Sequence, residues 1–213
     1  MSLFLGKIHY WLFNKIRWFE ILEENIIDLA KSEGLDIDSL REAIENKYGQ
    51  KLPKKPLEEL IDTSNIHNWL QSQIHSAERR NAAWTKVLIE ANENNYKKLE
   101  VVYKEQAIIA ANEVKEEGKS VATPNEIFNA MNDYILDGMP CDRVNEVLSN
   151  EENKIKLQAI ICVHKDILKE VGCDVNYFYN LRNTWIKVFV NNLNEDFKYV
   201  VEDNIKAIER ISK

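Results

Sequence analysis

The chain has 213 residues, of which 45% are hydrophobic and 30% charged, and its net charge is −7 at pH 7. A chain of this length can bury a substantial core, and we assign residues 1–213 to one all-helical domain. Acidic and basic residues are interleaved along the chain, without a basic face or arm, so the composition argues against a nucleic-acid-binding protein.

The apolar segments are too short for a membrane protein. A helix that crosses a bilayer needs roughly 20 consecutive apolar residues, and Lys7, Asn14, Lys15 and Arg17 interrupt the most apolar segment. Segment 1–7 is hydrophobic, but charges lie inside this apolar stretch and no small-residue cleavage site follows, so it is not a signal peptide. We therefore expect a cytoplasmic protein that does not bind membranes.

The first helix is predicted to end at Gly34, because apolar residues recur up to that point at steps of three, four or seven. A second row, Phe4, Trp11 and Trp18, repeats every seven residues beside this seam. So much aromatic surface on adjoining strips indicates that the helix is covered on more than one side, within a bundle or by another subunit. The pattern favours a homodimer through the first helix, and it identifies no other protein partner.

The longest regular stretch, 65–117, contains neither proline nor glycine, and its apolar residues recur at helical spacing. A straight helix of this length would reach roughly 80 Å, which exceeds the size of a compact domain. We therefore predict a bend or hairpin at 92–95.

The second half of the chain is also predicted to be helical. Thr123, Pro124 and Glu126 combine an N-cap, a first-turn proline and a capping box, which predicts a helix from there to about Gly138. No alternation of apolar and polar residues bounded by a hairpin turn stands out. The expected fold is an all-α up-and-down bundle of four or more long helices with short accessory helices, and its last helices are predicted over about 140–149, 149–172, 174–193 and 194–211.

A polar strip on the long stretch is one candidate metal site. His67 and His75 lie eight residues apart with Gln71 between them, and Glu78 follows three residues later, so the side chains stack along one helix face. Helical bundles hold transition metals with such stacks of imidazole and carboxylate from facing helices. The strip predicts either half of a divalent-metal site or a solvated polar face.

His164 is a candidate because it occupies a predicted buried row, one turn after Ile160 and one turn before Ile167. A buried imidazole needs hydrogen-bond partners or a metal. It is predicted to be either a satisfied core histidine or a member of a functional cluster with His67, His75 and Glu78.

Arg182 borders the inward row of its helix, where a guanidinium needs a carboxylate partner. Glu78, Asp142 and Asp166 are the predicted partners, and binding of an anionic ligand is the alternative role. Cys141 and Asp142 lie at a predicted helix start, where the positive end of the helix dipole would favour a reactive thiolate.

Four segments of the chain carry a resemblance to known proteins: 6–12 (GKIHYWL), 65–71 (NIHNWLQ), 137–142 (DGMPCD) and 181–186 (LRNTWI). They resemble an uncharacterised family of small all-helical bacterial proteins. The resemblance spans most of the chain and implies a helical fold without a known activity. In outline, the expected architecture is also similar to metal-binding bundles of the hemerythrin and DinB type, although the chain lacks their H-x-x-x-H pair.

The sequence leaves two hypotheses for function. The first is a non-catalytic bundle that works through self-association or protein contacts. The alternative is a bundle with a metal or small-ligand pocket lined by His67, His164, Glu78 and Arg182, which could be enzymatic.

Overall fold

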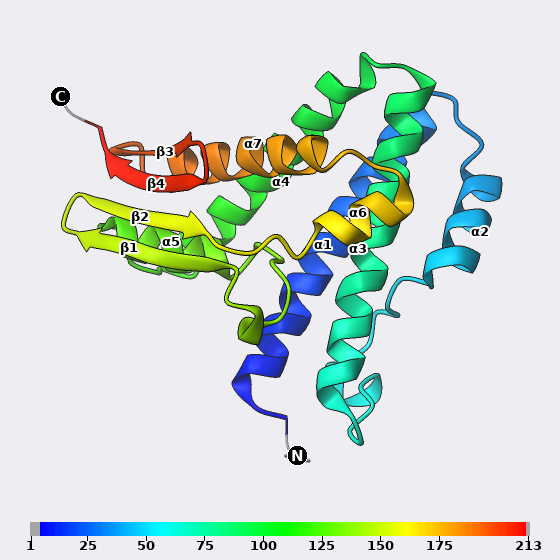
Figure 1. Ribbon diagram of the computed structural model, residues 1–213, viewed down its shortest axis with the longest axis horizontal. Coiled ribbons are helices and arrows are strands. Elements are labelled where there is room, and N and C mark those ends of the chain that lie inside the picture. The colour runs from blue at the N-terminus through cyan, green and yellow to red at the C-terminus, as the bar shows by residue number, and fades with distance from the viewer. Residues whose placement is uncertain (1–4, 212–213) are drawn as a thin grey trace.

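The computed structural model describes residues 5–211, which fold into seven α-helices, two short 3-10 helices and four strands (Figure 1). Four long helices, α1, α3, α4 and α7, form the body of the protein, and the strands lie together at one end of it. In chain order the elements are α1 (Lys7–Ser32), α2 (Ile37–Tyr48), η1 (Leu57–Glu59), α3 (Ile66–Ala91), α4 (Asn95–Glu116), α5 (Pro124–Asn132), η2 (Pro140–Asp142), β1 (Asn145–Glu151), β2 (Lys154–Ala159), α6 (Lys165–Val171), α7 (Val175–Leu193), β3 (Phe197–Glu202) and β4 (Ile205–Arg210).

The stretch 65–117 folds as two helices, α3 and α4, so the predicted break at 92–95 is confirmed. The side chain of Asn65 caps α3 by accepting a hydrogen bond from a backbone N–H of its first turn at 3.3 Å. At the break, Nδ2 of the buried Asn95 donates to the carbonyl of Leu88 at 3.1 Å. The same carbonyl also accepts from the backbone N–H of Asn92 at 3.2 Å, so the two bonds together fix the turn between the helices.

A buried ion-pair network fastens α1 to α3. Arg80 donates from NH2 to Oε1 of Glu20 at 2.9 Å and from Nε to Oε1 of Glu23 at 3.0 Å. Glu20 also accepts a hydrogen bond from the backbone N–H of Leu52 at 2.9 Å, which holds the connector after α2 against α1. These three charged side chains are at most 4% exposed. Each charge has partners, so we assign the network a structural role.

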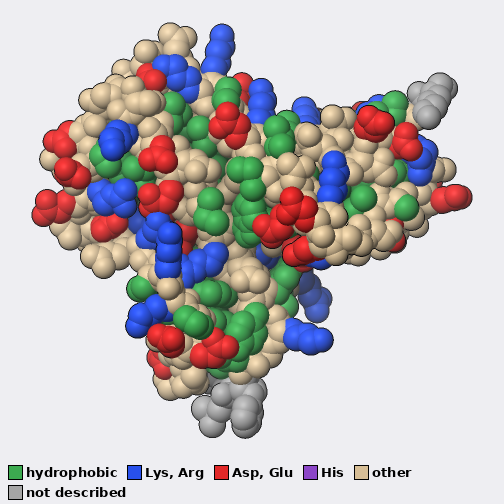
Figure 2. Space-filling model, turned by 180° about the vertical axis from the view of Figure 1, so that it is seen from behind, with side chains coloured by type: hydrophobic (Ala, Val, Ile, Leu, Met, Phe, Trp, Pro, Cys, Tyr) green, Lys and Arg blue, Asp and Glu red, His purple; other side chains and the backbone are tan. Residues whose placement is uncertain are grey.

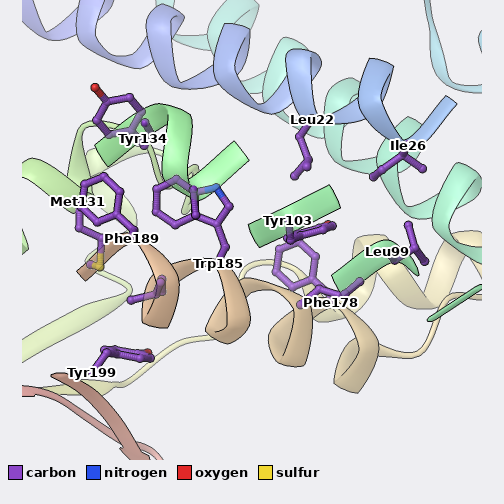
Figure 3. Close-up of a cluster of buried hydrophobic side chains, with 14 of the residues drawn as sticks. Leu22, Ile26, Leu99, Tyr103, Met131, Tyr134, Phe178, Trp185, Phe189 and Tyr199 are labelled. Carbon is purple, nitrogen blue, oxygen red and sulfur yellow. The ribbon is translucent and has the colours of Figure 1, made fainter. Parts of the chain in front are cut away.

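The main hydrophobic core lies around α7 (Figure 3). The rings of Trp185 and Phe189 stack with centroids 4.9 Å apart, and Tyr134 packs on Phe189 at 5.7 Å. The indole Nε1 of Trp185 donates to Oε1 of Gln106 at 3.1 Å, so the polar end of this buried side chain is satisfied. Phe178, Leu181, Trp185 and Phe189, which share one face of α7, are all buried.

The four strands form one antiparallel sheet in the order β1-β2-β4-β3. Ile155 and Leu157 alternate with polar residues on β2 and are buried, as expected for a strand with one face on a core. β3 and β4 join through a two-residue turn in which Asp203 has φ 54, a left-handed conformation that Asp tolerates better than most residues. The sheet packs on α5 and α7.

The predicted all-α bundle is therefore wrong, because the chain contains a four-strand sheet. Strands of six or seven residues present only a few inward side chains, and such short apolar runs are easily assigned to helices. Ile160 and Ile161, predicted in a buried helical row, follow the end of β2 and are each 51% exposed. Three segments predicted as helices contain strands instead: 140–149 holds η2 and part of β1, 149–172 holds the rest of β1, β2 and α6, and 194–211 holds β3 and β4.

Helix α5 begins where the sequence predicts and ends earlier. Thr123 and Glu126 form the expected capping box, with the backbone N–H of Glu126 donating to Oγ1 of Thr123 at 3.3 Å. The helix ends at Asn132, whereas the prediction placed its end near Gly138. The residues released from the helix form a loop that carries Asp137 toward the interior.

The surface is mixed in character. On the face opposite to that of Figure 1, hydrophobic side chains form a broken band between acidic and basic ones (Figure 2). Ile8, Tyr10 and Ile21 on α1 are 37–49% exposed. Within residues 5–211, no helix has both the length and the apolar character needed to cross a bilayer.

Candidate functional site

His164 is the centre of a buried polar cluster. Its Nε2 lies 2.8 Å from Oδ1 of Asp137 and 3.1 Å from NH1 of Arg182. Its Nδ1 lies 2.7 Å from Oε1 of Glu78. We call these four residues the His164 cluster. The side chain of His164 is 1% exposed and that of Asp137 is 15% exposed, so the cluster approaches the surface only at Asp137.

Four separate segments supply the His164 cluster: α3, the loop after α5, the N-cap of α6, and α7. Arg182 holds the loop, since its NH1 donates to Oδ1 of Asp137 at 2.7 Å and its NH2 donates to the carbonyl of Leu136 at 2.6 Å. Asn145, the first residue of β1, donates to the other carboxylate oxygen of Asp137 at 2.9 Å. Asp137 therefore joins the loop, the sheet and α7.

Asp137 is ionised even though it is largely buried. Burial raises the pKa of its carboxyl, but the Arg182 guanidinium and the hydrogen bond from His164 outweigh this effect and hold the pKa well below its usual range. The carboxylate consequently provides a fixed negative charge at neutral pH, and it does not serve as a proton donor.

The contact between Glu78 and His164 is close without being a hydrogen bond. Oε1 of Glu78 and Nδ1 of His164 are 2.7 Å apart, yet their relative direction is unsuitable, and each lacks a hydrogen-bond partner within the described chain. Buried polar atoms without partners cost free energy. Such incomplete satisfaction is more typical of functional sites than of structural networks such as that of Arg80.

A cleft of about 230 Å³ opens beside the His164 cluster, between α1, α5 and the segment that leads into β1. At ~30 Å³ per water molecule, it has room for about eight waters or for an organic molecule of similar size. Its lining is largely polar around Asp137 and apolar elsewhere. The lining residues are Trp11, Lys15, Phe128, Asn132, Asp137, Gly138, Met139, Pro140, Arg143, Val144 and Asn145.

Lys15 brings a buried ammonium group to this cleft. The residue is 3% exposed, and its Nζ lies 3.4 Å from Oδ1 of Asn132 and 3.9 Å from the centre of the Trp11 ring. Among residues 5–211, no carboxylate oxygen lies within 4.0 Å of this Nζ. Burial lowers the pKa of Lys15 to about 8; the charges of Asp137 and Asp133 oppose this shift and that of Arg182 adds to it.

Cationic side chains gather at the cleft and the His164 cluster, although the chain as a whole has a net charge of −7. The charge of Arg182 acts on both Lys15 and Lys206, and burial lowers the pKa of Lys206. Three carboxylates face these three cations, namely Glu78, Asp137 and Asp133. The charges therefore nearly balance, and attraction of an anion to the cleft depends on Lys15 itself.

Three of the residues singled out from the sequence come together here: His164, Glu78 and Arg182. His67 is exposed in the first turn of α3, and His75 contacts Gln71 at 2.9 Å, so neither belongs to the His164 cluster. Over the described range 5–211, no three or more His, Cys, Asp or Glu side chains are placed to hold one metal ion. The geometry therefore does not favour the metal-binding alternative.

Cys141 and Asp142 lie in η2, next to the cleft but outside the His164 cluster. Cys141 is exposed. Oδ2 of Asp142 accepts a hydrogen bond from the backbone N–H of Met139 at 2.7 Å and closes the turn. Gly138 has φ +72, and a Cβ on it would lie 2.6 Å from Oδ2 of Asp142, so this turn requires glycine. Asp142 thus shapes one wall of the cleft.

Two central residues were not identified from the sequence, Asp137 and Lys15. Arg182 forms its ion pair with Asp137 and not with any of the carboxylates predicted as its partners. A signal for Asp137 was its place before a glycine in a helix-ending turn. The signal for Lys15 was its spacing, because it follows Leu12 by three residues and so shares the buried face of α1.

No protein-family model, curated protein or solved structure matches the chain. The resemblance to small helical bacterial proteins therefore stays a prediction.

Proposed function

We propose that the protein binds a small organic anion, bearing a carboxylate or a phosphate group, in the cleft beside the His164 cluster. The observation that carries this proposal is the position of Lys15, whose ammonium group is buried at the cleft without a carboxylate partner among residues 5–211. An unpaired buried charge destabilises the folded protein. An anionic ligand would supply the missing partner and recover part of this free energy.

The surroundings of Lys15 support an anion of limited size. Lys206 and the rim residue Arg143 add positive charge, while the ionised Asp137 disfavours a second negative group deep in the cleft. The volume of about 230 Å³ lies below the range typical of sites for drug-sized ligands and suits a smaller molecule. These features favour a monoanion of a few carbon atoms.

Thermal unfolding in the presence of matched ligands tests the proposal. Lactate, succinate and inorganic phosphate are the anionic probes, and lactamide is the neutral analogue of lactate. A probe present at ten times its Kd stabilises the folded state by about 1.4 kcal/mol, which raises Tm by roughly 3–6 °C for a chain of this size. At least one anion is expected to produce this shift, and lactamide is not.

The Lys15→Met variant assigns the effect to the cleft, and Lys31→Met, an exposed position on the same helix, is its control. Titration calorimetry is expected to show binding to the wild type and to Lys31→Met, with at least tenfold weaker binding to Lys15→Met. Equal binding of the anion to both variants, or equal shifts with anionic and neutral probes, would refute the proposal.

Self-association through α1 is a second candidate function. A groove of about 690 Å³ runs along α1 and is lined by Tyr10, Trp11, Trp18 and Ile21. Its α1 side carries Lys7 and Arg17, and its opposite side carries acidic residues of α4 and the loop after α5. In a twofold dimer, each basic side would meet the acidic side of the other copy. Phe4, the first member of the predicted aromatic row, lies outside the described residues.

Light scattering coupled to size-exclusion chromatography tests this second candidate. A dimer that becomes monomeric in Ile21→Glu, while Ile109→Glu on the exposed face of α4 remains dimeric, would support an interface on α1. A wild-type monomer at high micromolar concentration would refute it. Anion binding in the cleft is measured separately and does not depend on this result.

A further inference from the structure

The amine of Lys15 combines three properties that a simple anion-binding residue does not need. It is buried, it makes no ion pair with a carboxylate in the described chain, and it lines an open cleft. A site that only binds anions is better served by arginine, which stays charged and binds carboxylates through two parallel hydrogen bonds. Lysine is instead the residue whose amine becomes nucleophilic when it is desolvated or placed near another cation.

The protonation equilibrium of Lys15 agrees with this reading. With the pKa lowered to about 8, about a tenth of the amine is neutral at pH 7, compared with less than a thousandth for an ordinary lysine. The pKa is lowered because burial and the nearby Arg182 guanidinium both disfavour the ammonium form. A usable fraction of nucleophilic amine is therefore present at neutral pH.

We propose that Lys15 forms an imine with the carbonyl carbon of a small 2-oxo acid bound in the cleft. This inference rests on the proposed anion-binding function, since the carboxylate of the oxo acid is the anion that the cationic side chains hold. The neutral Nζ of Lys15 adds to the carbonyl carbon and gives a carbinolamine. The carbon–oxygen bond then breaks, the oxygen leaves as water with both amine protons, and a carbon–nitrogen double bond remains.

The cleft supplies what this condensation requires of its surroundings. No oxidant or reductant is needed, and protons exchange with the solvent through the open mouth of the cleft. The protonated imine is positively charged, and the fixed negative charge of Asp137, which already acts on the Lys15 ammonium, would stabilise it. Asp137 is a positioning group in this scheme, because His164 and Arg182 hold it in place and keep it ionised.

Reductive trapping tests the proposal directly. The full-length protein is incubated with pyruvate and sodium cyanoborohydride, which reduces an imine to a stable secondary amine. Intact mass spectrometry is expected to show one adduct with the mass of pyruvic acid less one oxygen atom, and peptide mapping is expected to place it on Lys15. Lys31→Met should be labelled to the same extent as the wild type.

The Lys15→Arg variant keeps the positive charge and cannot form an imine. It is expected to lose the adduct. Lactate binding without any trapped adduct in the wild type would overturn the imine and leave the proposed function standing. An adduct spread over several lysines, or retained in Lys15→Arg, would also overturn it. Absence of both lactate binding and trapping would refute both proposals.

Discussion

Replacing Lys15 with methionine is expected to stabilise the protein at neutral pH. Methionine has a similar length and no charge, and it would occupy a site that is already in the interior, since Lys15 is only 3% exposed. Burial lowers the pKa of Lys15 from its ordinary value of 10.5 to about 8. At ~1.36 kcal/mol per unit, keeping this lysine charged in the folded state costs roughly 3 kcal/mol at pH 7.

The sign of the pH dependence follows from the lowered pKa. Below about pH 8, Lys15 is charged in both the folded and unfolded states, so its full cost is present. Between about pH 8 and 10.5, the unfolded chain holds the proton that the folded protein has lost, and stability rises with pH. The gain from Lys15→Met is therefore expected to fall from roughly 2–3 kcal/mol at pH 7 to about zero at pH 10, after allowing about 1 kcal/mol for the lost contact with Trp11.

Urea unfolding followed by tryptophan fluorescence measures this difference. The free energy of unfolding of the wild type, Lys15→Met and Lys31→Met is compared at pH 7 and pH 10. Lys31→Met, at an exposed position, should stay within about 0.5 kcal/mol of the wild type at both values. A Lys15→Met protein that is less stable than the wild type at pH 7, or whose gain does not shrink at pH 10, would refute the account of Lys15 as a costly buried cation.

Three further predictions concern the scaffold. Arg80→Met leaves the buried Glu23 without its ion pair and Glu20 with Arg17 alone, so it should lower the free energy of unfolding by about 3–5 kcal/mol in urea unfolding. In contrast, Arg79→Met removes a surface pair with Glu170 and should cost less than about 1 kcal/mol. Similar losses from both variants would contradict the structural role of the network. Thr123→Ala removes the cap of α5 and should cost about 1 kcal/mol, measured as a shift in Tm. Trp84→Ala leaves a cavity in the core, because Trp84 is only 1% exposed, and should lower the free energy of unfolding by about 3–5 kcal/mol in urea unfolding.

The helices could be predicted from the sequence where they are long, and the strands could not. Over α3 and α4 the apolar spacing continues for many turns, so a helix is the only regular structure that fits it. β2 offers only Ile155 and Leu157 as inward residues, and Leu157 also fits a helical row with the later isoleucines. The pairing that decides between these readings joins β2 to β4, whose residues lie about fifty positions later in the chain. A local pattern contains no information about such a partner.

The candidate site could be predicted only in part, for a similar reason. His164, Glu78 and Arg182 stood out because each is a polar residue on or beside an apolar row, which is a local property of one helix. That they meet depends on the packing of α3, α6 and α7. Asp137 lies in a loop without periodicity, so its burial follows from tertiary structure alone. Asp166, predicted as a partner of Arg182, is exposed.

The network of Arg80 and the His164 cluster both bury charged side chains, but they differ in how completely their polar atoms are hydrogen-bonded. In the network of Arg80, the guanidinium and both carboxylates have hydrogen-bond partners, and the network joins two helices and a connector. In the His164 cluster, two buried atoms in contact lack hydrogen-bond partners in the described chain, and the neighbouring Lys15 has no carboxylate oxygen of residues 5–211 within 4.0 Å of its Nζ. Selection for stability alone would replace such a lysine with an apolar residue. The anion that we propose would complete the charge at this lysine, and Lys15→Met, which is expected to stabilise the protein, is also expected to weaken anion binding at least tenfold.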